Sequence, residues 1–444
     1  MKAIRWVSLW VLVALGSGVP SAWAGLFSGL TRDLDCEPAA TDFRVALSVS
    51  SFAEFVLSSG ITYRDGGIEA TDLESLQQLF VRYGATEVFS RLGTVEQVNT
   101  PADRTLAGTL RRATVAHSLG LSFNPEVSLF GTYGDVSCQT PPEFAGYPDL
   151  GFSGEWTDLT LEEMLPILEA YGELIAQTIL DTGVTVNVWD LGNEIEYGTA
   201  GVAVAPIPGA CDNEAGPNWY QPPDNVDPDI GTRDVISLFT SPVADQIAWL
   251  NENLWPYEAQ LLKAVADGIR EVDPNARFAT HIANSHSAEF AVAFYEAMSD
   301  GGMDFDELGL SFYPSSPLDL DLAGRIDAFK ATVTALNTTF GKPVFVAEYA
   351  YPASRILFGP FSNWDNKVPG YSLRERGQAQ LLRDLTAWGS ENGLSGIRPW
   401  APDFVNSGIP IWNAMALFQK RGNKAKPRSS MCSILYGLED AAAP

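Results

Sequence analysis

The sequence is short of histidine, of positive charge and of Gly-rich nucleotide motifs, and each shortage excludes a class of protein. Only three histidines are present, His117, His281 and His286, and none belongs to an HExxH spacing, so a metal-dependent hydrolase has little support. No GxGxxG follows the first expected strand, which leaves a dinucleotide-binding fold unsupported. No calcium-ligand loop is apparent after the last expected strand. We therefore expect no cofactor and no bound metal.

Positive charge is scarce as well. The chain has 28 Lys and Arg residues against 55 Asp and Glu residues, which gives a net charge of −27. A field of that sign repels phosphate backbones and polyuronates, so nucleic acids and anionic polysaccharides are poor partners. The basic cluster at residues 420–428 is expected to be a solvated loop.

Long apolar runs are missing except at the N-terminus. Residues 1–24 combine basic Lys2 and Arg5, an apolar stretch and a small-residue ending, AWA, which is the pattern of a secretory signal peptide. No other stretch approaches the roughly 20 apolar residues of a membrane-spanning helix. We expect residues 25–444 to be secreted or periplasmic, without a membrane partner after cleavage, and to act as a monomer.

Short β-branched or aromatic runs alternate with longer stretches of helical period. This alternation predicts parallel strands joined by crossover helices, and eight such units fit one α/β domain, a single (β/α)8 TIM barrel in residues 25–444. A Pro- and Gly-rich insertion follows the fourth strand at residues 198–245. The expected strands are 43–49, 86–93, 120–125, 186–193, 277–283, 308–314, 343–349 and 396–402, with helices such as 72–84, 160–183, 249–272, 323–341 and 374–393 between them.

The four cysteines, Cys36, Cys138, Cys211 and Cys432, are even in number and contain no CxxC or CxH spacing. In an exported chain this pattern favours disulfides over zinc. Cys138 and Cys211 follow the third and fourth strands on one face of the barrel. Ring closure brings Cys36 close to Cys432. We therefore expect the pairs Cys138–Cys211 and Cys36–Cys432.

Two of the expected strands end in glutamate, the fourth with Glu194 after Asn193 and the seventh with Glu348. Residues at the C-terminal ends of barrel strands project into one shared pocket. Two carboxylates across a pocket are what glycoside hydrolysis requires, one to protonate the leaving oxygen and one to attack or to activate water. Asn193 is placed to bind a sugar hydroxyl. Glu196 and Tyr197 are expected to begin the next loop.

Other strand ends carry side chains that suit a sugar-binding pocket. An aromatic face stacks on a pyranose ring, while Arg and Tyr can hold a carboxylate ionised. The aromatic residues Tyr313 and Trp400 can equally belong to the core, and His281 can equally be a buried, hydrogen-bonded core histidine. The expected supporting residues are Arg91 from strand two, His281 and Asn284 from strand five, Tyr313 from strand six and Trp400 from strand eight.

Three segments carry a family resemblance: NVWDLGNEIEYG at 187–198, DFDELGLSFYP at 304–314 and VFVAEYAYP at 344–352. They resemble the strand-four, strand-six and strand-seven motifs of clan A glycoside hydrolases, in particular family 53, the endo-β-1,4-galactanases. The tail WNAMALFQKRGNKAKP, from residue 412, looks like the closing segment of that family. The resemblance implies a retaining enzyme with Glu194 as acid/base and Glu348 as nucleophile, supported by Arg91, Asn193, Tyr313 and Trp400.

The chain also departs from that family in two places. Residues 123–135, FNPEVSLFGTYGD, stand where the family usually has a His-Tyr-Ser-Asp-Trp-like stretch, and the insertion at 198–245 has no obvious counterpart. The leading expectation is a retaining glycosidase acting on a neutral β-linked polysaccharide, with β-1,4-galactan as first substrate. The alternatives are another clan A glycosidase or transglycosidase, with a mannan, glucan or arabinan-related substrate, and a catalytically silent carbohydrate-binding barrel.

Overall fold

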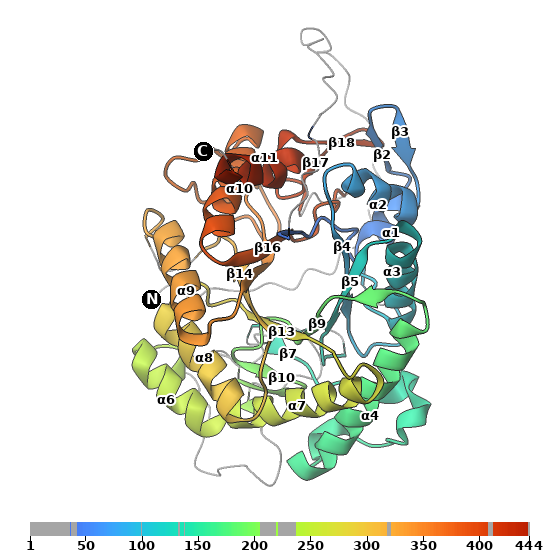
Figure 1. The fold of residues 1–444 in the computed structure, drawn as a ribbon, viewed down its shortest axis with the longest axis vertical. Coiled ribbons are helices and arrows are strands. Elements are labelled where there is room, and N and C mark those ends of the chain that lie inside the picture. The colour runs from blue at the N-terminus through green and yellow to red at the C-terminus, as the bar shows by residue number, and fades with distance from the viewer. Residues whose placement is uncertain are drawn as a thin grey trace.

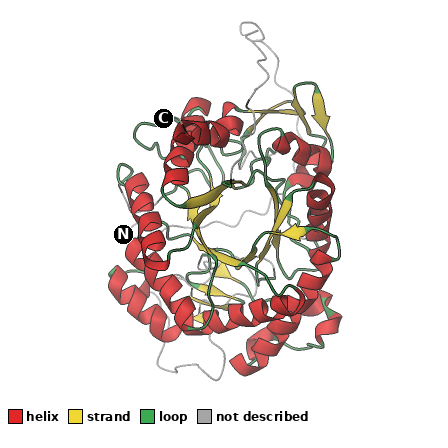
Figure 2. Cartoon of the chain, in the orientation of Figure 1, coloured by secondary structure: helices red, strands yellow, loops and turns green. Residues whose placement is uncertain are grey.

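The computed structural model is a ring of parallel strands enclosed by helices (Figures 1 and 2). The expected signal peptide lies outside the described residues, as does most of the insertion expected at 198–245. None of the described helices is long and apolar enough to cross a bilayer. The structure describes residues 36, 42–98, 100–131, 134–136, 138–204, 219–220, 237–317, 321–406 and 412–442.

Eight parallel strands form the barrel, in the hydrogen-bonded order β1-β16-β15-β14-β13-β9-β5-β4. The ring closes between β1 and β4 through the Thr86 amide, which donates to the Val45 carbonyl at 3.1 Å, and through the Ser48 hydroxyl. The predicted (β/α)8 barrel is thus confirmed. The strands are β1 (Arg44–Val45), β4 (Glu87–Leu92), β5 (Ser122–Val127), β9 (Trp189–Leu191), β13 (Phe278–Ile282), β14 (Glu307–Phe312), β15 (Val344–Tyr349) and β16 (Leu394–Pro399), with β8 (Thr185–Val186) also paired to β5.

The helices begin and end where capping residues allow. Asp72 and Thr160 each accept a hydrogen bond from the backbone N–H three residues on, while Gly120 and Gly341 take the left-handed conformation that ends a helix. The helices are α1 (Ala53–Ser58), α2 (Leu73–Val81), α3 (Leu106–Leu119), α4 (Leu161–Leu180), α6 (Val243–Asn253), α7 (Trp255–Val272), α8 (Ala288–Asp300), α9 (Arg325–Phe340), α10 (Glu375–Glu391) and α11 (Ser433–Ala442). Short 3-10 helices lie at Phe144–Gly146, Pro148–Leu150, Trp156–Asp158 and Ser429–Cys432.

In the described part of the chain, three smaller sheets are formed by strands outside the barrel. Strands β6 (Gly134–Asp135) and β7 (Cys138–Gln139) form a hairpin after β5. Strands β10 (Gly198–Thr199), β11 (Val202–Val204) and β12 (Trp219–Tyr220) form a sheet after β9. A third sheet has the order β17-β18-β2-β3, from β2 (Thr62–Asp65), β3 (Ile68–Ala70), β17 (Phe418–Arg421) and β18 (Lys424–Pro427).

The expectation of a solvated loop at residues 420–428 is wrong. Most of the segment lies in the β17-β18 hairpin, and β18 pairs in parallel with β2 from the start of the chain. Arg428 is buried, because its guanidinium donates to the carbonyls of Ala416 and Asn413, each at 3.1 Å. Arg428 therefore serves the packing of the C-terminal segment, whereas Arg421, Lys424 and Lys426 of the same hairpin are exposed, as expected.

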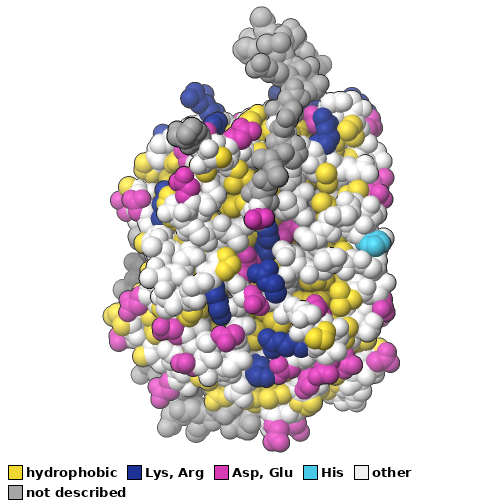
Figure 3. All heavy atoms as spheres, in the orientation of Figure 1, with side chains coloured by type: hydrophobic (Ala, Val, Ile, Leu, Met, Phe, Trp, Pro, Cys, Tyr) yellow, Lys and Arg dark blue, Asp and Glu magenta, His cyan; other side chains and the backbone are white. Residues whose placement is uncertain are grey.

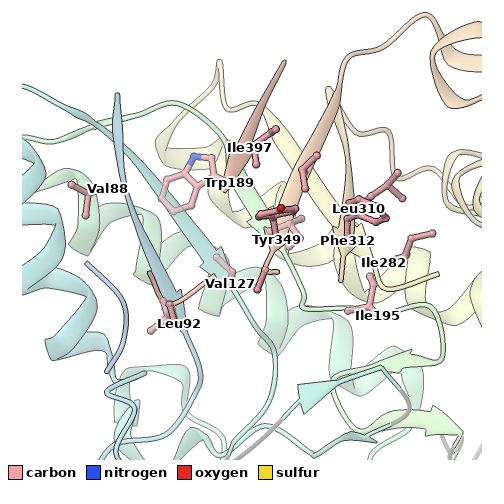
Figure 4. Packing of buried hydrophobic residues seen from close by; sticks show 14 of the residues in the cluster. Val88, Leu92, Val127, Trp189, Ile195, Ile282, Leu310, Phe312, Tyr349 and Ile397 are labelled. Carbon is pink, nitrogen blue, oxygen red and sulfur yellow. The ribbon is translucent and has the colours of Figure 1, made fainter. Parts of the chain in front are cut away.

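Apolar side chains from the strands fill the space between the strands and the helices. Figure 4 shows part of this core, contributed by strands from β4 to β16, and every labelled side chain in it is nearly inaccessible to solvent. Burial of one such side chain stabilises the folded state by about 1.5–3 kcal/mol. The rigid core fixes the strand ends, where the candidate site lies.

The predicted disulfide between Cys36 and Cys432 is confirmed, with the two Cα atoms 5.8 Å apart. It joins the segment before β1 to the segment before α11, as ring closure of a barrel requires. Cys138 is also disulfide-bonded, but its predicted partner, Cys211, lies outside the described residues.

The surface is charged around its outline. On the face shown in Figure 3, Asp and Glu side chains are spread along both sides of the molecule, and Lys and Arg side chains lie in the middle and at the upper outline. This distribution agrees with the net charge of −27.

Candidate active site

The predicted site residues lie at the C-terminal ends of the barrel strands. Arg91 is in β4, His281 in β13 and Glu348 in β15. Asn193 and Glu194 follow β9 directly, and the remaining three, Asn284, Tyr313 and Trp400, follow β13, β14 and β16. All but Asn284 contact one another or line the same pocket.

Arg91 is the centre of the site. Its guanidinium donates to Glu348, to the side-chain oxygen of Asn193 and to Glu126, where the second contact measures 3.3 Å. The side chain is buried, which disfavours its charge, but the carboxylates of Glu126 and Glu348 outweigh this cost and raise the pKa of Arg91. One cation therefore binds three acceptors that arrive from β5, β9 and β15.

Glu348 is held as a hydrogen-bond acceptor. One carboxylate oxygen accepts from Arg91 and the other from the hydroxyl of Tyr313. Burial, and then the negative charge of Glu348, raises the pKa of Tyr313 well above its ordinary value, so the phenol stays protonated and keeps donating. Two donors, one of them charged, therefore orient the Glu348 carboxylate.

Glu194 has the opposite surroundings. It is buried, and burial is the largest cause that raises its pKa well above the ordinary value, followed by the charges of Asp135 and Glu348. Its backbone takes the left-handed conformation, with φ of 49°, which is uncommon for a residue with a side chain. The pKa of one carboxyl of the site is therefore raised, while the other carboxyl accepts hydrogen bonds from a guanidinium and a phenol. Such a contrast is the pattern of an acid and a nucleophile or base.

Asn193 and His281 complete the base of the site. His281 Nε2 lies 3.0 Å from the side-chain oxygen of Asn193, which also accepts from Arg91, and Asn193 Nδ2 donates to the Gly134 carbonyl at 2.6 Å. Burial lowers the pKa of His281, but the nearby Asp190 carboxylate, 3.5 Å from Nδ1, outweighs it and raises the pKa overall. The imidazole is thus a polar member of the site and not an isolated core histidine.

Trp400 lies in the mouth of the barrel. It is partly exposed and packs edge-on against Trp412 at 4.5 Å and Phe52 at 5.7 Å between ring centroids. Tyr313 packs against Trp364 at 5.1 Å. The pocket beside Trp400 is lined partly by small residues, among them three serines, and partly by aromatic and basic side chains, namely Phe52, Phe89, Arg91, Arg104, Arg398 and Trp400. Such a lining suits a ring with an apolar face and hydroxyl edges.

Asn284 is the predicted residue that the structure leaves apart. Its backbone N–H donates to Glu196 at 2.9 Å, and among the described residues its side-chain oxygen has no partner. Glu196 lies in the turn after β9, as expected, but it is buried and also accepts from the Ala283 amide at 3.0 Å. Glu196 therefore anchors the segment after β13 instead of facing solvent.

Sequence reasoning missed three acids of the site. Glu126 accepts from Arg91 and, at 2.7 Å, from Ser128, and it is fully buried. Asp190 binds His281 and Arg398, and Asp135 contacts Glu194. The position of Glu126 near the end of β5 was the available signal, because the same logic selected Glu194 and Glu348.

The cluster of Glu126, His281 and Glu348 has the donor types of a metal site, with ligand atoms within 4.8 Å of one another. Arg91 donates to both of these carboxylates. The guanidinium therefore supplies the positive charge that a metal would otherwise provide, and the residues do not favour an ion.

A second pair of buried carboxyl groups lies below the site. Glu258, in α7, is fully buried, and within the described part of the chain neither of its oxygens has a hydrogen-bond partner. Burial, and then the charge of Glu196, raises the pKa of Glu258 well above the ordinary 4.5, while burial raises the pKa of Glu196 to about 7. Both groups favour a protonated folded state at mildly acidic pH.

We predict that Arg91→Ala lowers the free energy of unfolding by about 3–5 kcal/mol, because it leaves Glu126 and Glu348 buried without their cation. The matched control is Arg383→Ala, since Arg383 and its partner Asp440 are both 44% exposed. The control should cost less than about 1 kcal/mol. Urea unfolding followed by circular dichroism compares the two, and equal losses would contradict a central role for Arg91.

We predict that Glu258→Gln flattens the dependence of stability on pH. A carboxyl whose pKa is higher in the folded protein contributes its full stability below the pKa of the unfolded chain, about 4.3. This contribution is lost as the pH rises through the pKa of the folded protein. The free energy of unfolding of the wild type should therefore fall as the pH rises from about 4.3 to 7, the pKa of Glu196, and beyond. In Glu258→Gln the fall should be smaller. Unfolding at several pH values tests this against Glu271→Gln, an exposed change in the same helix. A slope unchanged by Glu258→Gln would refute the account.

Comparison with known proteins agrees with this geometry. The family model of glycosyl hydrolase family 53 matches residues 240–432. An uncharacterised protein of Niallia circulans is 29% identical over 202 residues, 42% of this chain and 52% of that protein. The arabinogalactan endo-β-1,4-galactanase of Cellvibrio japonicus is 29% identical over 160 residues, 34% of this chain and 41% of that protein. The matched part thus spans about half the length of these relatives.

Among solved structures, the family 53 catalytic domain of Ignisphaera aggregans matches 89% of this chain and 96% of its own, with a TM-score of 0.62 and 19% identity. At that identity the likeness bears on the fold, which is the same barrel. The C-terminal half of the chain is thus similar to the glycoside hydrolases of family 53, and the whole barrel shares their fold.

Proposed function

We propose that the protein is a secreted retaining glycoside hydrolase that cleaves a neutral β-linked polysaccharide, with endo-β-1,4-galactanase as the specific activity. The observation that carries the proposal is the pair of carboxyl groups at the ends of β9 and β15. Glu194 is buried beside other acids, and Glu348 is bound by Arg91 and Tyr313. A carboxyl with a raised pKa suits the role of the acid, and a carboxyl oriented by Arg and Tyr donors suits the role of the nucleophile.

In the first step, Glu348 attacks the anomeric carbon while Glu194 gives its proton to the leaving glycosidic oxygen. The bond from the anomeric carbon to that oxygen breaks, and a glycosyl ester on Glu348 forms. The attacking carboxylate oxygen gives up its charge as the ester forms. Arg91 and Tyr313 therefore have to keep the carboxylate oriented without binding it so tightly that attack is prevented.

In the second step, Glu194 acts as a base. It takes a proton from a water molecule that attacks the anomeric carbon, and the ester bond to Glu348 breaks. The charge of Glu348 contributes to the raised pKa of Glu194 in the free protein. That contribution disappears while Glu348 is esterified, so Glu194 more readily stays ionised until it accepts the proton from water.

The substrate assignment draws on the relatives and on charge. The Cellvibrio japonicus relative is an arabinogalactan endo-β-1,4-galactanase, and the net charge of this chain disfavours an anionic polymer. Trp400 supplies an aromatic face in the pocket, and Asn193 has a second N–H beyond the one that binds Gly134. A neutral hexose with one apolar face and free hydroxyls fits these groups.

Export is supported by the N-terminal sequence and by the disulfide chemistry. Residues 1–24 have the pattern of a signal peptide, and the bond between Cys36 and Cys432 suits an oxidising compartment. We propose a monomer that acts outside the cell or in the periplasm. A polymeric substrate that cannot enter the cell fits that location.

Product release from a panel of neutral β-glycans tests the proposal. The panel holds galactan, mannan, glucan, xylan and arabinan, with wild type beside Glu194→Ala and Glu348→Ala. We expect wild type to release oligosaccharides from galactan, and each variant to lose about 10²-fold or more, because each loses a general acid or a nucleophile. Proton NMR of the first product should show the β-anomer, as retention requires.

The outcomes distinguish a galactanase from another glycosidase and from a carbohydrate-binding barrel without activity. Activity on another glycan would replace galactan as the substrate and keep the chemistry. Release of the α-anomer first would exclude the retaining mechanism. Binding of a glycan without cleavage by wild type would favour a silent carbohydrate-binding barrel, and azide restoring activity to Glu194→Ala would support its role as acid/base.

A further inference from the structure

Glu126 is a buried acid at the base of the site that the two-step chemistry does not use. It lies on β5, where its register partners are Arg91 on β4 and Asp190 on β9. The side chain is fully buried and lies near the C-terminal end of the strand. A buried carboxyl group needs hydrogen-bond partners within the protein, so these partners determine what Glu126 can do.

Three hydrogen bonds hold the Glu126 side chain in place. One carboxylate oxygen accepts from Nε of Arg91 and, at 2.7 Å, from the hydroxyl of Ser128. The other oxygen accepts from Nη2 of Arg91 at 3.3 Å. Glu126 therefore binds the Nε edge of the guanidinium through two N–H groups, an arrangement that fixes the orientation of an arginine.

The same guanidinium reaches Glu348 through Nη2, which also donates to Asn193. One carboxylate oxygen of Glu126 and one of Glu348 lie within 4.8 Å of each other. Because Glu126 occupies the Nε edge, Glu348 cannot form a two-point pair with that edge. Arg91 thus orients one oxygen of Glu348 and leaves the other to Tyr313.

A guanidinium that is shared in this way binds Glu348 more weakly than one that pairs with it at two points. A carboxylate that is bound too strongly before the reaction is a poorer nucleophile, because it gives up that stabilisation as it attacks. Burial is the largest influence on the pKa of Arg91 and lowers it, and among the charges that raise it, Glu126 comes before Glu348. Arg91 is therefore shared with an acid that takes no part in bond formation.

We propose that Glu126 is a positioning residue that acts through Arg91: it holds the Nε edge of the guanidinium, so that Glu348 is oriented by Nη2 alone and keeps its reactivity toward the anomeric carbon. This inference rests on the proposed retaining glycosidase and names a residue that neither step uses directly. Glu126 lies in residues 123–135, where the chain departs from the family 53 pattern.

Glu126 gains and loses no proton in the cycle. In the first step an oxygen of Glu348 bonds to the anomeric carbon, the bond from that carbon to the leaving oxygen breaks, and the proton of Glu194 goes to the leaving oxygen. Esterified Glu348 then has no charge to offer Arg91, and Glu126 remains as the partner of the guanidinium. Arg91 therefore stays in place for the second step, in which Glu348 leaves the anomeric carbon as a carboxylate and accepts from Nη2 again.

Two other neighbours of Glu126 have to be separated from this role. His281 Nε2 lies 4.0 Å from the second oxygen of Glu126 and 3.0 Å from the side-chain oxygen of Asn193. Ser128 donates to the first oxygen. Glu126→Gln keeps the shape of the side chain and leaves both neighbours in place, but it removes the charge and one acceptor for Arg91.

The test measures the two chemical steps separately in wild type and Glu126→Gln. A 2-deoxy-2-fluoro glycosyl fluoride of the sugar that the panel identifies slows both steps, and its leaving group needs no acid. Mass spectrometry gives the first step as the rate at which the protein gains the glycosyl mass, and the second as the rate at which it loses this mass after the reagent is removed.

In Glu126→Gln we expect ester formation to slow about 10-fold or more, because the freed Nε edge of Arg91 binds the nucleophile. Ester hydrolysis should slow by less than about twofold, because Glu348 is then the leaving group and stronger binding of its carboxylate assists its departure. Equal slowing of the two steps would indicate a merely structural role and overturn the proposal. Slowing of neither step, with the fold intact by circular dichroism, would also overturn it.

Glu87→Gln is the matched control, because Glu87 is also a fully buried glutamate and pairs with an arginine, Arg44, at 3.2 Å. It lies at the other end of β4 from Arg91, and both rates of this variant should equal those of wild type. If Glu126→Gln does not fold, Glu126→Asp keeps the charge on a side chain too short to hold both nitrogens. Ester formation should again slow more than ester hydrolysis, and equal slowing would again overturn the proposal.

A second measurement keeps this result separate from the glycosidase assignment. Nitrogen-15 NMR of labelled arginine detects the Nε–H group of Arg91, with its signal assigned by its loss in Arg91→Lys. The proton signal should move upfield in Glu126→Gln, which removes a charged acceptor of Nε–H, and stay in place in Glu348→Gln. An unmoved signal in Glu126→Gln would reject the pairing itself, whereas a moved signal without activity would reject only the enzyme assignment.

Discussion

The site depends on one buried cation. Arg91 reaches Glu126 from β5, Asn193 from the end of β9 and Glu348 from β15, so a single guanidinium joins strands from opposite parts of the barrel wall. Charges in such a place are costly unless they are paired with good geometry, and here each of the three acceptors meets an N–H. The planar guanidinium spreads its donors over Nε and the terminal nitrogens, which an ammonium, with all its N–H groups on one atom, does not. Because the barrel fixes where these strands end, the fold determines the arrangement of charges from which the chemistry follows.

Glu194 and Glu348 are the same residue type and differ only in their surroundings. Glu348 contacts a guanidinium and a phenol, while Glu194 is buried near other acids. The groups responsible for this contrast come from separate elements. Arg91 and Tyr313 belong to strand ends of the barrel itself, whereas Asp135 and Gln139 belong to a hairpin in the loop after β5. A change in such a loop can alter the surroundings of Glu194 while leaving those of Glu348 in place, because function varies through the loops of a barrel more than through its strands.

Much of this could be predicted from the sequence where the signal is local. Apolar β-branched runs predicted the eight strands, and acids at the ends of two such runs led to Glu194 and Glu348. The contacts of Gly134 and Gln139 with Asn193 could not be predicted, since they depend on how a hairpin folds back over another loop. The basic cluster at 420–428 was misjudged for the same reason, because the buried position of Arg428 depends on carbonyl groups at 413 and 416 that only the tertiary fold brings to it. Glu126 also lies near the end of a strand, as Glu194 and Glu348 do, but it was not predicted as a site residue.

The most direct test of the proposed chemistry is to trap the covalent intermediate. A 2-deoxy-2-fluoro glycosyl fluoride of the cleaved sugar reacts with a retaining enzyme and hydrolyses slowly, so the labelled peptide can be identified by mass spectrometry. The account predicts one added glycosyl group on the peptide that contains Glu348, and none in Glu348→Ala. A label on another residue, or no label on an enzyme that releases product of inverted configuration, would contradict the assignment of Glu348 as nucleophile.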